Sequence, residues 1–250
     1  MQDYAIDIQH LDKSFTLFRH TTGIKGMVLH LPKYIKDRTS PRTKQVFKDF
    51  SLQVPAGETL GIAGANGCGK TTLLSLIGKV IKPDRGTVKT RGRISMMLAL
   101  GAGFANELSG RENIILNGVL QGMPRRKMNE LLEEIIDVTE ISGEFIDAPI
   151  YTYSSGMRAR LGFGVAIMTD PDILLVDEVL SVGDSAFQQK CTEMIRAKQK
   201  KGMTIVLVSH NRSQLRDFCT SLIYMQGGQV LLSGSPESVM AEINNRKLVF

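Results

Sequence analysis

Three features that define other classes of protein are missing from this chain of 250 residues. It has only three cysteines, Cys68, Cys191 and Cys219, and no C-x-x-C pair, so neither a disulfide framework nor a zinc site is expected. No apolar run approaches the roughly 18 residues that cross a bilayer. The first ten residues also lack the charged and then apolar segments of a secretory signal. We therefore expect a cytoplasmic protein, or one that is peripheral to a membrane.

The positive charge of the chain is concentrated in one segment. The net charge is +6, and residues 19–45 alone hold seven basic residues against Asp37. Within this basic insertion, four apolar residues recur at helical spacing until Pro32: Ile24, Met27, Val28 and Leu31. A basic, amphipathic segment is typical of a membrane interface, although a surface helix packed on its own domain shows the same pattern. We expect the insertion to face the bilayer and not to touch a nucleotide.

Strand-like and helix-like segments alternate along the rest of the chain. Strands are predicted at 4–15, 45–58, 59–65, 172–178, 204–210 and 221–234. Helices are predicted at 70–81, 106–141 and 186–202, the first because Leu73, Leu76, Ile77 and Val80 share one face and the second with breaks at Gly122 and Pro124. Such alternation predicts an α/β fold with a mainly parallel core sheet, an antiparallel β part at the N-terminus and a helical subdomain at about 100–165. We treat residues 1–250 as one domain.

The segment GANGCGKT, Gly64 to Thr71, matches the phosphate-binding pattern G-x-x-x-x-G-K-[ST] and lies between a predicted strand and a predicted helix. Its glycines let successive backbone N–H groups face a phosphate, Lys70 reaches the β- and γ-phosphates, and the Thr71 hydroxyl ligates Mg²⁺. We expect Cys68, inside this loop, to have a reactive thiol that bound nucleotide protects. The predicted nucleotide-binding residues of the loop are Gly64, Ala65, Asn66, Gly67, Cys68, Gly69, Lys70, Thr71 and Thr72.

Polar residues also follow two later strands. Asp177 and Glu178 end the apolar run of the strand at 172–178, where a carboxylate is costly unless it is paired or near a metal. Asp177 suits the binding of Mg²⁺ through water, and Glu178 suits a general base that polarises an attacking water. His210 ends the next strand. Because the carboxyl ends of parallel strands meet at one edge of a sheet, we expect His210 near the phosphate loop, as a third catalytic residue with Lys70 and Glu178.

The segment TYSSGMRAR, Thr152 to Arg160, predicts the start of a helix with two arginines in its first turns. The positive end of the helix dipole disfavours cations there by roughly 0.3 to 1 kcal/mol each. A group of negative charge should therefore lie close to Arg158 and Arg160.

Together and in this order, these motifs resemble the ATPase subunit of ABC transporters over nearly the whole chain. The resemblance implies a P-loop ATPase that uses ATP and Mg²⁺ and works as a head-to-tail homodimer with two ATP molecules at its interface. The family's signature motif, usually L-S-G-G-Q, binds the ATP held by the other subunit, and its counterparts here are Ser154, Ser155, Gly156 and Met157. ATP from a second chain would then explain the arginines of this helix start.

Two further sites follow from the same resemblance. The segment SVGD, Ser181 to Asp184, matches the family's loop at the dimer seam. An aromatic residue of the N-terminal strands usually stacks on adenine, which indicates Phe15, with Phe18 as the alternative.

Three stretches, TYSSGM, LGAGFANELSGRENIILNG and DEVLSVGDSAFQQKC, are similar to the branch that exports bacterial surface polysaccharides: O-antigen, capsule or teichoic acid. The similarity implies a separate permease in the membrane, a lipid-linked glycan as the transported molecule and a place at the cytoplasmic face of the inner membrane, with no nucleic-acid partner. Ala99 stands where relatives have Gln or Glu, so a water is expected to replace that Mg²⁺ ligand. The C-terminal glycan-binding sandwich of some relatives is not expected, because the chain ends at Phe250.

Other functions stay open at this point. The chain could be the ATPase of another transporter, a soluble ABC-type ATPase acting on ribosomes or DNA, or a nucleotide-binding scaffold without turnover. A single uninterrupted domain argues against the ribosomal and DNA-repair types. The presence of Lys70, Asp177, Glu178 and His210 argues against the scaffold.

Overall fold

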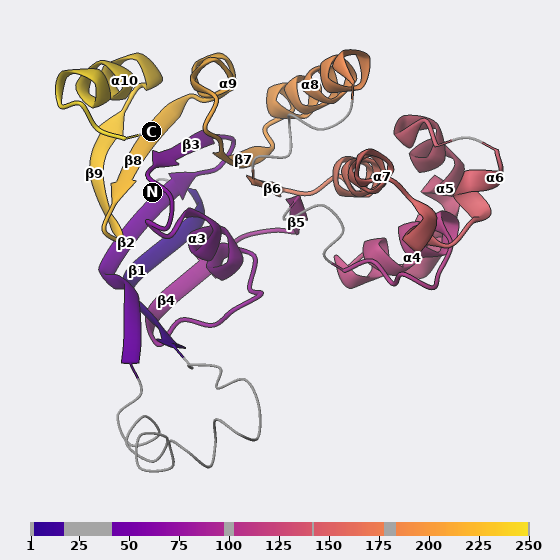
Figure 1. The fold of residues 1–250 in the computed structure, drawn as a ribbon, viewed down its shortest axis with the longest axis horizontal. Helices are drawn as coiled ribbons and strands as arrows, with labels where there is room; N and C mark the ends of the chain where they lie inside the picture. Colours follow the sequence, from indigo (N-terminus) through magenta and orange to yellow (C-terminus); the bar gives the residue numbers. More distant parts are fainter. Residues whose placement is uncertain (1–2, 18–41, 98–102, 142, 178–183, 250) are drawn as a thin grey trace, which may run out of the picture.

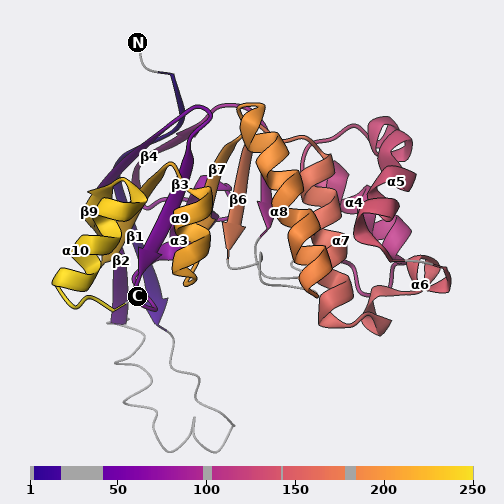
Figure 2. The same ribbon diagram turned by 90° about the horizontal axis from the view of Figure 1, so that it is seen from above.

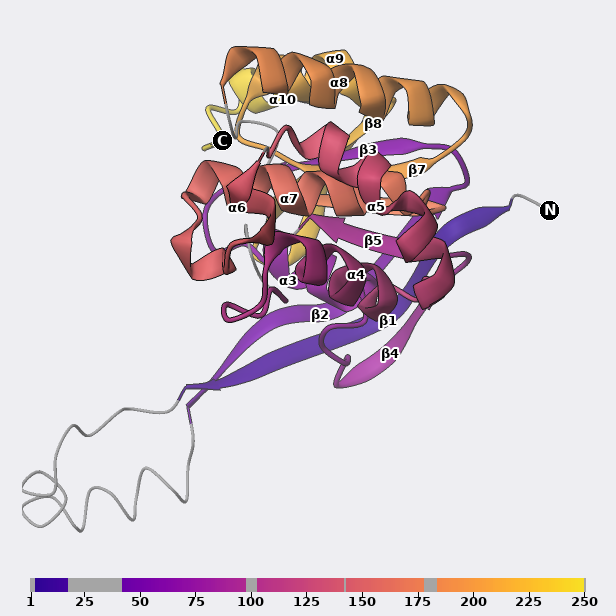
Figure 3. The ribbon, with the colours of Figure 1, turned by 90° about the vertical axis from the view of Figure 1, so that its right-hand side faces the viewer.

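Two β-sheets and a group of helices form the fold in the computed structural model, which describes residues 3–17, 42–97, 103–141, 143–177 and 184–249. The first sheet has the antiparallel order β2-β1-β4, made of β1 (Tyr4–Leu17), β2 (Arg42–Pro55) and β4 (Arg85–Thr90). β1 and β2 form a long hairpin whose distal end projects beyond the rest of the described chain (Figure 3).

The second sheet has the order β5-β6-β7-β3-β8-β9. Its strands are β3 (Thr59–Gly64), β5 (Ile94–Met97), β6 (Ile173–Asp177), β7 (Thr204–Val208), β8 (Ser221–Gln226) and β9 (Gln229–Gly234). All neighbours from β5 to β8 are parallel, and β9 pairs with β8 antiparallel. β3 and β7 are buried along their whole length, as expected for central strands covered on both faces.

Helices cover both faces of this second sheet (Figure 1). α3 (Lys70–Ile77) packs between the two sheets, in an apolar core to which β1, β2, β3, β6, β7 and β8 contribute. The opposite face is covered by α7 (Ser155–Met168), α8 (Ser185–Lys200), α9 (Arg212–Phe218) and α10 (Pro236–Asn245).

The remaining helices gather on one side of the molecule, against α7 (Figure 2). They are α4 (Gly110–Leu120), α5 (Arg125–Thr139), α6 (Glu144–Asp147) and the 3₁₀ turn η1 (Ile150–Thr152). Ser109 and Glu112 start α4 with a reciprocal capping box. The buried residues of α4, α5 and α7 form their own apolar cluster, so α7 belongs to two cores at once. None of the helices in the described ranges combines the length and apolar character that a membrane span requires.

The α/β fold with a mainly parallel core sheet is confirmed, but several details of the prediction were wrong. The segment 221–234 is not one strand: Gly227 and Gly228, both with positive φ, turn it into the antiparallel pair β8 and β9. Antiparallel pairing is therefore not confined to the N-terminus. β4 was missed because it is polar and mostly exposed, and β5 because it has only four residues. α3 ends at Ile77, so Val80 lies outside the helix and is 65% exposed.

Candidate functional site

The carboxyl ends of three adjacent strands, β6, β7 and β3, meet at one edge of the parallel sheet. The loop after β3 is the predicted phosphate loop, β6 ends in Asp177, and His210 follows β7 closely. These segments and the β1–β2 hairpin enclose a cavity of about 490 Å³. It is lined by Phe15, Lys44, Val46, Asn66, Gly67, Gly69, Lys70, Thr71, Thr72, Asp177 and His210.

The loop between β3 and α3 curls around its own lysine. Lys70 is the first residue of α3, is 7% exposed, and its Nζ donates to the carbonyl oxygens of Gly64 at 2.5 Å and Ala65 at 3.3 Å. Gly69 precedes it in the left-handed conformation with φ 112°. The ammonium group is thus held inside the curl, at the start of a helix, where backbone N–H groups favour anions. A phosphate chain is the ligand that this arrangement suits.

Thr71 and Asp177 meet at the same cavity from different elements. The Thr71 hydroxyl donates to Asp177 Oδ2 over 2.9 Å, which joins the start of α3 to the end of β6. A hydroxyl and a carboxylate are hard oxygen donors of the kind that Mg²⁺ prefers, and Mg²⁺ commonly takes its other ligands from phosphates and water. The two residues present therefore fit a magnesium ion shared with a bound nucleotide.

Phe15 lies at the mouth of the cavity on β1. It is 39% exposed, and Lys13 Nζ lies 5.4 Å from its ring centroid while pairing with Asp84 Oδ1 at 2.8 Å. A half-exposed aromatic ring is available to stack on a base. Phe18, Ala99, Glu178 and Ser181 of the sequence prediction lie outside the described residues, as does the basic insertion up to residue 41 with its predicted amphipathic helix.

Sequence reasoning missed two residues of this cavity, Lys44 and Val46. The sequence placed Lys44 in the basic insertion, which was expected not to touch a nucleotide. In the structure Lys44 lies in β2 directly opposite Phe15 and lines the same cavity. Only the strand register brings the two residues together. The pairing of β1 with β2 could not be predicted from sequence patterns, because a long insertion separates the two strands.

The predicted signature segment begins α7, as expected. Ser154 is the N-cap, and its hydroxyl accepts from the backbone N–H of Met157 at 3.2 Å. Ser155 and Gly156 form the first turn. None of the residues 154–157 lines the cavity at the phosphate loop. One chain thus presents the phosphate loop and the signature helix start as two separate surfaces.

The negative charge that was expected close to Arg160 comes from carboxylates of the same chain. Its guanidinium pairs with Glu140, at the end of α5, and with Asp184, the N-cap of α8, and it stacks on Phe187 at 4.4 Å. Arg158 donates instead to the carbonyl of Ile150. The explanation by ATP from a second chain is therefore not needed for Arg160. Asp184, predicted at the dimer seam, caps α8 through the backbone N–H of Phe187.

The charges around Arg160 lead to a pH-dependent prediction. A hydrogen bond from Lys190, with help from Arg160, lowers the pKa of Glu140, and the Phe187 N–H followed by the charge of Arg160 lowers the pKa of Asp184. A carboxyl whose pKa is lowered on folding stabilises the fold above its unfolded pKa and stops doing so as pH falls through its folded value. Arg160→Met should therefore lower the thermal midpoint at pH 7 by about 2 to 4 °C and much less below pH 4.

Arg158→Met is the matched control, because Arg158 contacts only uncharged groups among the described residues. Its effect on the thermal midpoint should be the same at pH 7 and below pH 4. If Arg160→Met lowers the thermal midpoint by the same amount at both pH values, the ion pairs of Arg160 contribute nothing to stability.

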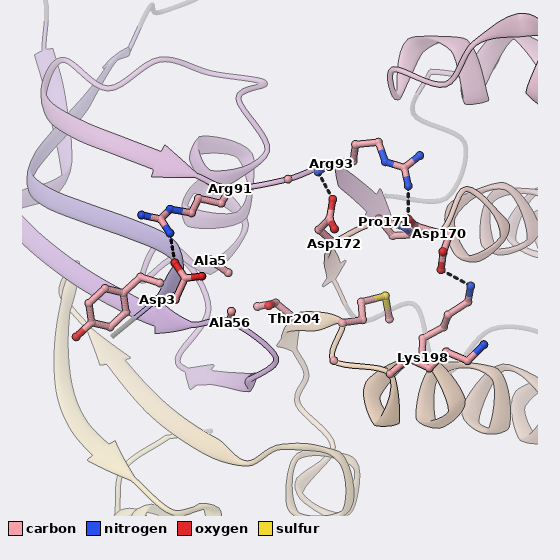
Figure 4. Close-up of a pocket in the computed structure, with 15 residues that line it drawn as sticks. Asp3, Ala5, Ala56, Arg91, Arg93, Asp170, Pro171, Asp172, Lys198 and Thr204 are labelled. Carbon is pink, nitrogen blue, oxygen red and sulfur yellow. Dashed lines mark hydrogen bonds and ion pairs between the residues drawn. The ribbon is translucent and has the colours of Figure 1, made fainter. Parts of the chain in front are cut away.

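A second cavity, of about 410 Å³, lies at the opposite, amino ends of β6 and β7 (Figure 4). Most of its charged side chains are already paired: Arg91 with Asp3, Lys198 with Asp170, and Asp172 with the backbone N–H of Arg93. The Arg93 guanidinium donates to the carbonyl of Asp170. These contacts connect the start of β6 to the start of β5 and to α8, and the start of β1 to the segment after β4, which gives this region a structural role.

A model of the ABC transporter family matches residues 47–181. The chain belongs to the ABC transporter family. It is 45% identical to the O-antigen export system ATP-binding protein RfbB of Klebsiella pneumoniae, over 94% of this chain and 96% of that protein. It is 38% identical to the teichoic acids export ATP-binding protein TagH of Staphylococcus saprophyticus, over 95% of this chain and 87% of that protein.

Solved structures show the same fold. The dimeric post-hydrolysis structure of the ATP-binding cassette MJ0796, bound to ADP and Pi, superposes with a TM-score of 0.73 at 20% identity over 92% of this chain and 98% of that chain. As an ABC ATPase, the chain is the ATP-binding and ATP-hydrolysing subunit of its transporter. The cavity at the phosphate loop lies at the carboxyl ends of the parallel strands, where open α/β sheets bind their ligands.

Cysteine modification provides a test of this ABC ATPase site. All three cysteines are buried; Cys68 lies in the phosphate loop, and Cys191 and Cys219 lie in the apolar core that covers the other face of the sheet. Burial raises the pKa of both Cys191 and Cys219 to about 12, so neither has an appreciable thiolate population near neutral pH. A thiol reagent should therefore modify Cys68 first and block ATP hydrolysis, and bound ATP should slow the inactivation by about tenfold or more. Residual ATPase activity against reagent exposure measures both effects.

The control is Cys68→Ala, which should keep its activity under the same treatment. If the alanine variant is inactivated as fast as the wild type, the reactive group lies elsewhere.

Proposed function

We propose that this ABC ATPase powers the export of a lipid-linked polysaccharide across the bacterial inner membrane, as the peripheral, cytoplasmic-side subunit of a transporter. The observation that carries the proposal is the identity of 45% and 38% to proteins named for O-antigen and teichoic acids export, each across more than nine-tenths of this chain. The named relatives thus support an export ATPase over one that acts on ribosomes or DNA.

The two separate surfaces of the chain favour a head-to-tail homodimer. The phosphate-loop cavity contains the binding groups of one half-site, and the start of α7 contains those of another. Two chains related by a twofold axis would bring each α7 start to the other chain's phosphate loop, so that two ATP molecules are held between them. The MJ0796 cassette of the same fold has been solved as a dimer.

Within each half-site, the residues have different roles. Lys70 and the backbone N–H groups of the loop bind the phosphates, Thr71 and Asp177 hold Mg²⁺, and Phe15 stacks on the adenine. Mg²⁺, when bound, neutralises charge that develops on the phosphate oxygens. Glu178, next to Asp177 in the sequence, polarises the attacking water, and His210 lines the same cavity from the end of β7. Ser154 to Met157 bind the second chain's ATP from the opposite side.

A third surface suits the membrane-embedded partner. An apolar cavity of about 370 Å³ lies between the sheet and the helical group, bounded by β5, α4 and α7. Val80 and Leu120 at this cavity are 65% and 67% exposed, and with the apolar lining they form a continuous exposed apolar surface of the kind that binds a protein partner. Arg158 of α7 also lines it, so a permease docked here would contact the signature helix.

The basic insertion provides the experiment that tests export. Replacing Lys25, Lys33, Lys36 and Arg38 with Gln should leave the ATPase rate of the isolated subunit within about twofold, because these residues stand outside the nucleotide motifs. The same change should reduce surface polysaccharide in a strain that depends on this gene, since each basic residue near anionic headgroups contributes on the order of 1 kcal/mol. Surface polysaccharide and ATPase rate are measured on the same variant.

The wild-type gene must restore surface polysaccharide in a deletion strain, and failure to do so would contradict the export function itself. If the variant with all four substitutions restores surface polysaccharide to the wild-type level, only the membrane role of the insertion is contradicted.

A further inference from the structure

Lys44 is a basic residue of the nucleotide cavity that none of the recognised motifs includes. It lies in β2, in the part of the hairpin that approaches the phosphate loop, and its side chain is exposed. It lines the cavity together with Lys70, Thr71 and Thr72. Its position therefore brings a second lysine, from a different sheet, to the place where the phosphates are bound.

The register of the hairpin determines where this lysine points. Lys44 is the direct partner of Phe15 in the antiparallel pair of β1 and β2. Side chains of directly opposed residues lie on the same face of a sheet, about 4.5 to 5.5 Å apart at Cβ. Phe15 and Lys44 both line the cavity, as this geometry requires. A nucleotide stacked on Phe15 would have Lys44 beside it.

The charge of Lys44 is not neutralised by the described part of the chain. Three other lysines of the chain form ion pairs with a carboxylate: Lys13 with Asp84, Lys190 with Glu140 and Lys198 with Asp170. Lys44 has no ion pair or hydrogen bond from its ammonium within the described residues. The acidic group of the cavity, Asp177, accepts from Thr71. An exposed cation in a phosphate-binding cavity suits an anionic ligand.

We propose that Lys44 binds the phosphate chain of the nucleotide, as a second cation beside Lys70. The proposal rests on the assignment of this cavity as the ATP site. Lys70 holds the phosphates from the loop, and Lys44 contacts them from the opposite wall, formed by the β1–β2 hairpin. The hairpin thus contributes to affinity through charge as well as through the aromatic ring of Phe15.

Equilibrium titration with a fluorescent ATP analogue tests the proposal. Lys44→Met should weaken binding by about tenfold at low salt, as expected for one charge-assisted contact to phosphate. The difference from wild type should shrink as salt is raised, because the side chain is exposed. Lys48→Met is the matched control, since Lys48 is an exposed lysine on the same strand that does not line the cavity. Its affinity should equal that of the wild type.

Inorganic tripolyphosphate, used as a competitor, distinguishes phosphate from base contacts. Its inhibition constant should rise in Lys44→Met by the same factor as the dissociation constant of the ATP analogue. An unchanged inhibition constant would place Lys44 at the base or ribose and overturn the proposal, as would equal affinities for Lys44→Met and Lys48→Met. Lys70→Met separates this failure from that of the site: if it binds the analogue as tightly as the wild type, the cavity is not the ATP site.

Discussion

Glu178→Gln is expected to reduce the rate of ATP hydrolysis by about 10²- to 10⁴-fold, the usual contribution of a general base. Glutamine has nearly the shape of glutamate but does not accept a proton from the attacking water. The change leaves in place Lys70, to which we assign phosphate binding, and Thr71 and Asp177, to which we assign Mg²⁺ binding. The variant should therefore bind ATP as tightly as the wild type while turning it over very slowly, which steady-state ATPase assays and equilibrium titration measure separately.

Trapped ATP should also hold two copies of this variant together. The start of α7 and the phosphate-loop cavity do not meet within one chain, so ATP that is not hydrolysed would join them between chains. Gel filtration of the variant with Mg-ATP should show a dimer that the wild type forms only transiently. A monomer under these conditions, with or without the membrane partner, would leave the role of Ser154 and Gly156 in binding the partner's ATP unsupported.

Gly64→Ala is the second change with a large expected effect, this time on stability. Gly64 closes β3 with φ 147°, a conformation that L-residues rarely adopt, and an added Cβ would lie 2.3 Å from the carbonyl oxygen of Met225 on β8. Met225 is fully buried on β8, which is paired on both sides by β3 and β9, so a shift of this oxygen would disturb both neighbours. We expect a loss of about 3 kcal/mol in the free energy of unfolding, and a thermal midpoint lower by about 6 to 12 °C.

Gly67→Ala provides the comparison for stability. Gly67 also has positive φ, 76°, but an added Cβ would meet nothing within 4 Å. Only the backbone preference opposes this change, at about 1 kcal/mol. Denaturant unfolding of both variants should show the larger loss for Gly64→Ala. Equal losses would mean that the contact with Met225 does not matter.

Local sequence patterns determined the chemistry of the site. The spacing of glycines, Lys70 and Thr71 indicated a phosphate loop between a strand and a helix, and the structure has that loop between β3 and α3. The apolar run before Asp177 indicated a buried strand, which is β6. These predictions succeeded because each depends on residues that are adjacent in the chain and on backbone preferences that act locally.

Contacts between distant segments could not be predicted in the same way. Arg160 looked unpaired because its partners, Glu140 and Asp184, stand 20 and 24 residues away in different helices. The segment 221–234 was predicted as one strand because its glycine turn is flanked by two strands of similar composition. In each case the relevant information is a packing arrangement that the sequence does not display.

By itself, the sequence determined that this protein folds as an α/β ATPase, where its phosphate loop lies and which carboxylates follow its central strands. Those properties follow from short motifs and from the period of apolar residues. Only the tertiary structure decided that Lys44 lies opposite Phe15 at the nucleotide cavity, that the signature helix start is separate from that cavity, and that Arg160 joins α5, α7 and α8. Strand register and helix packing set these contacts, because they depend on how whole elements bury their apolar faces against one another.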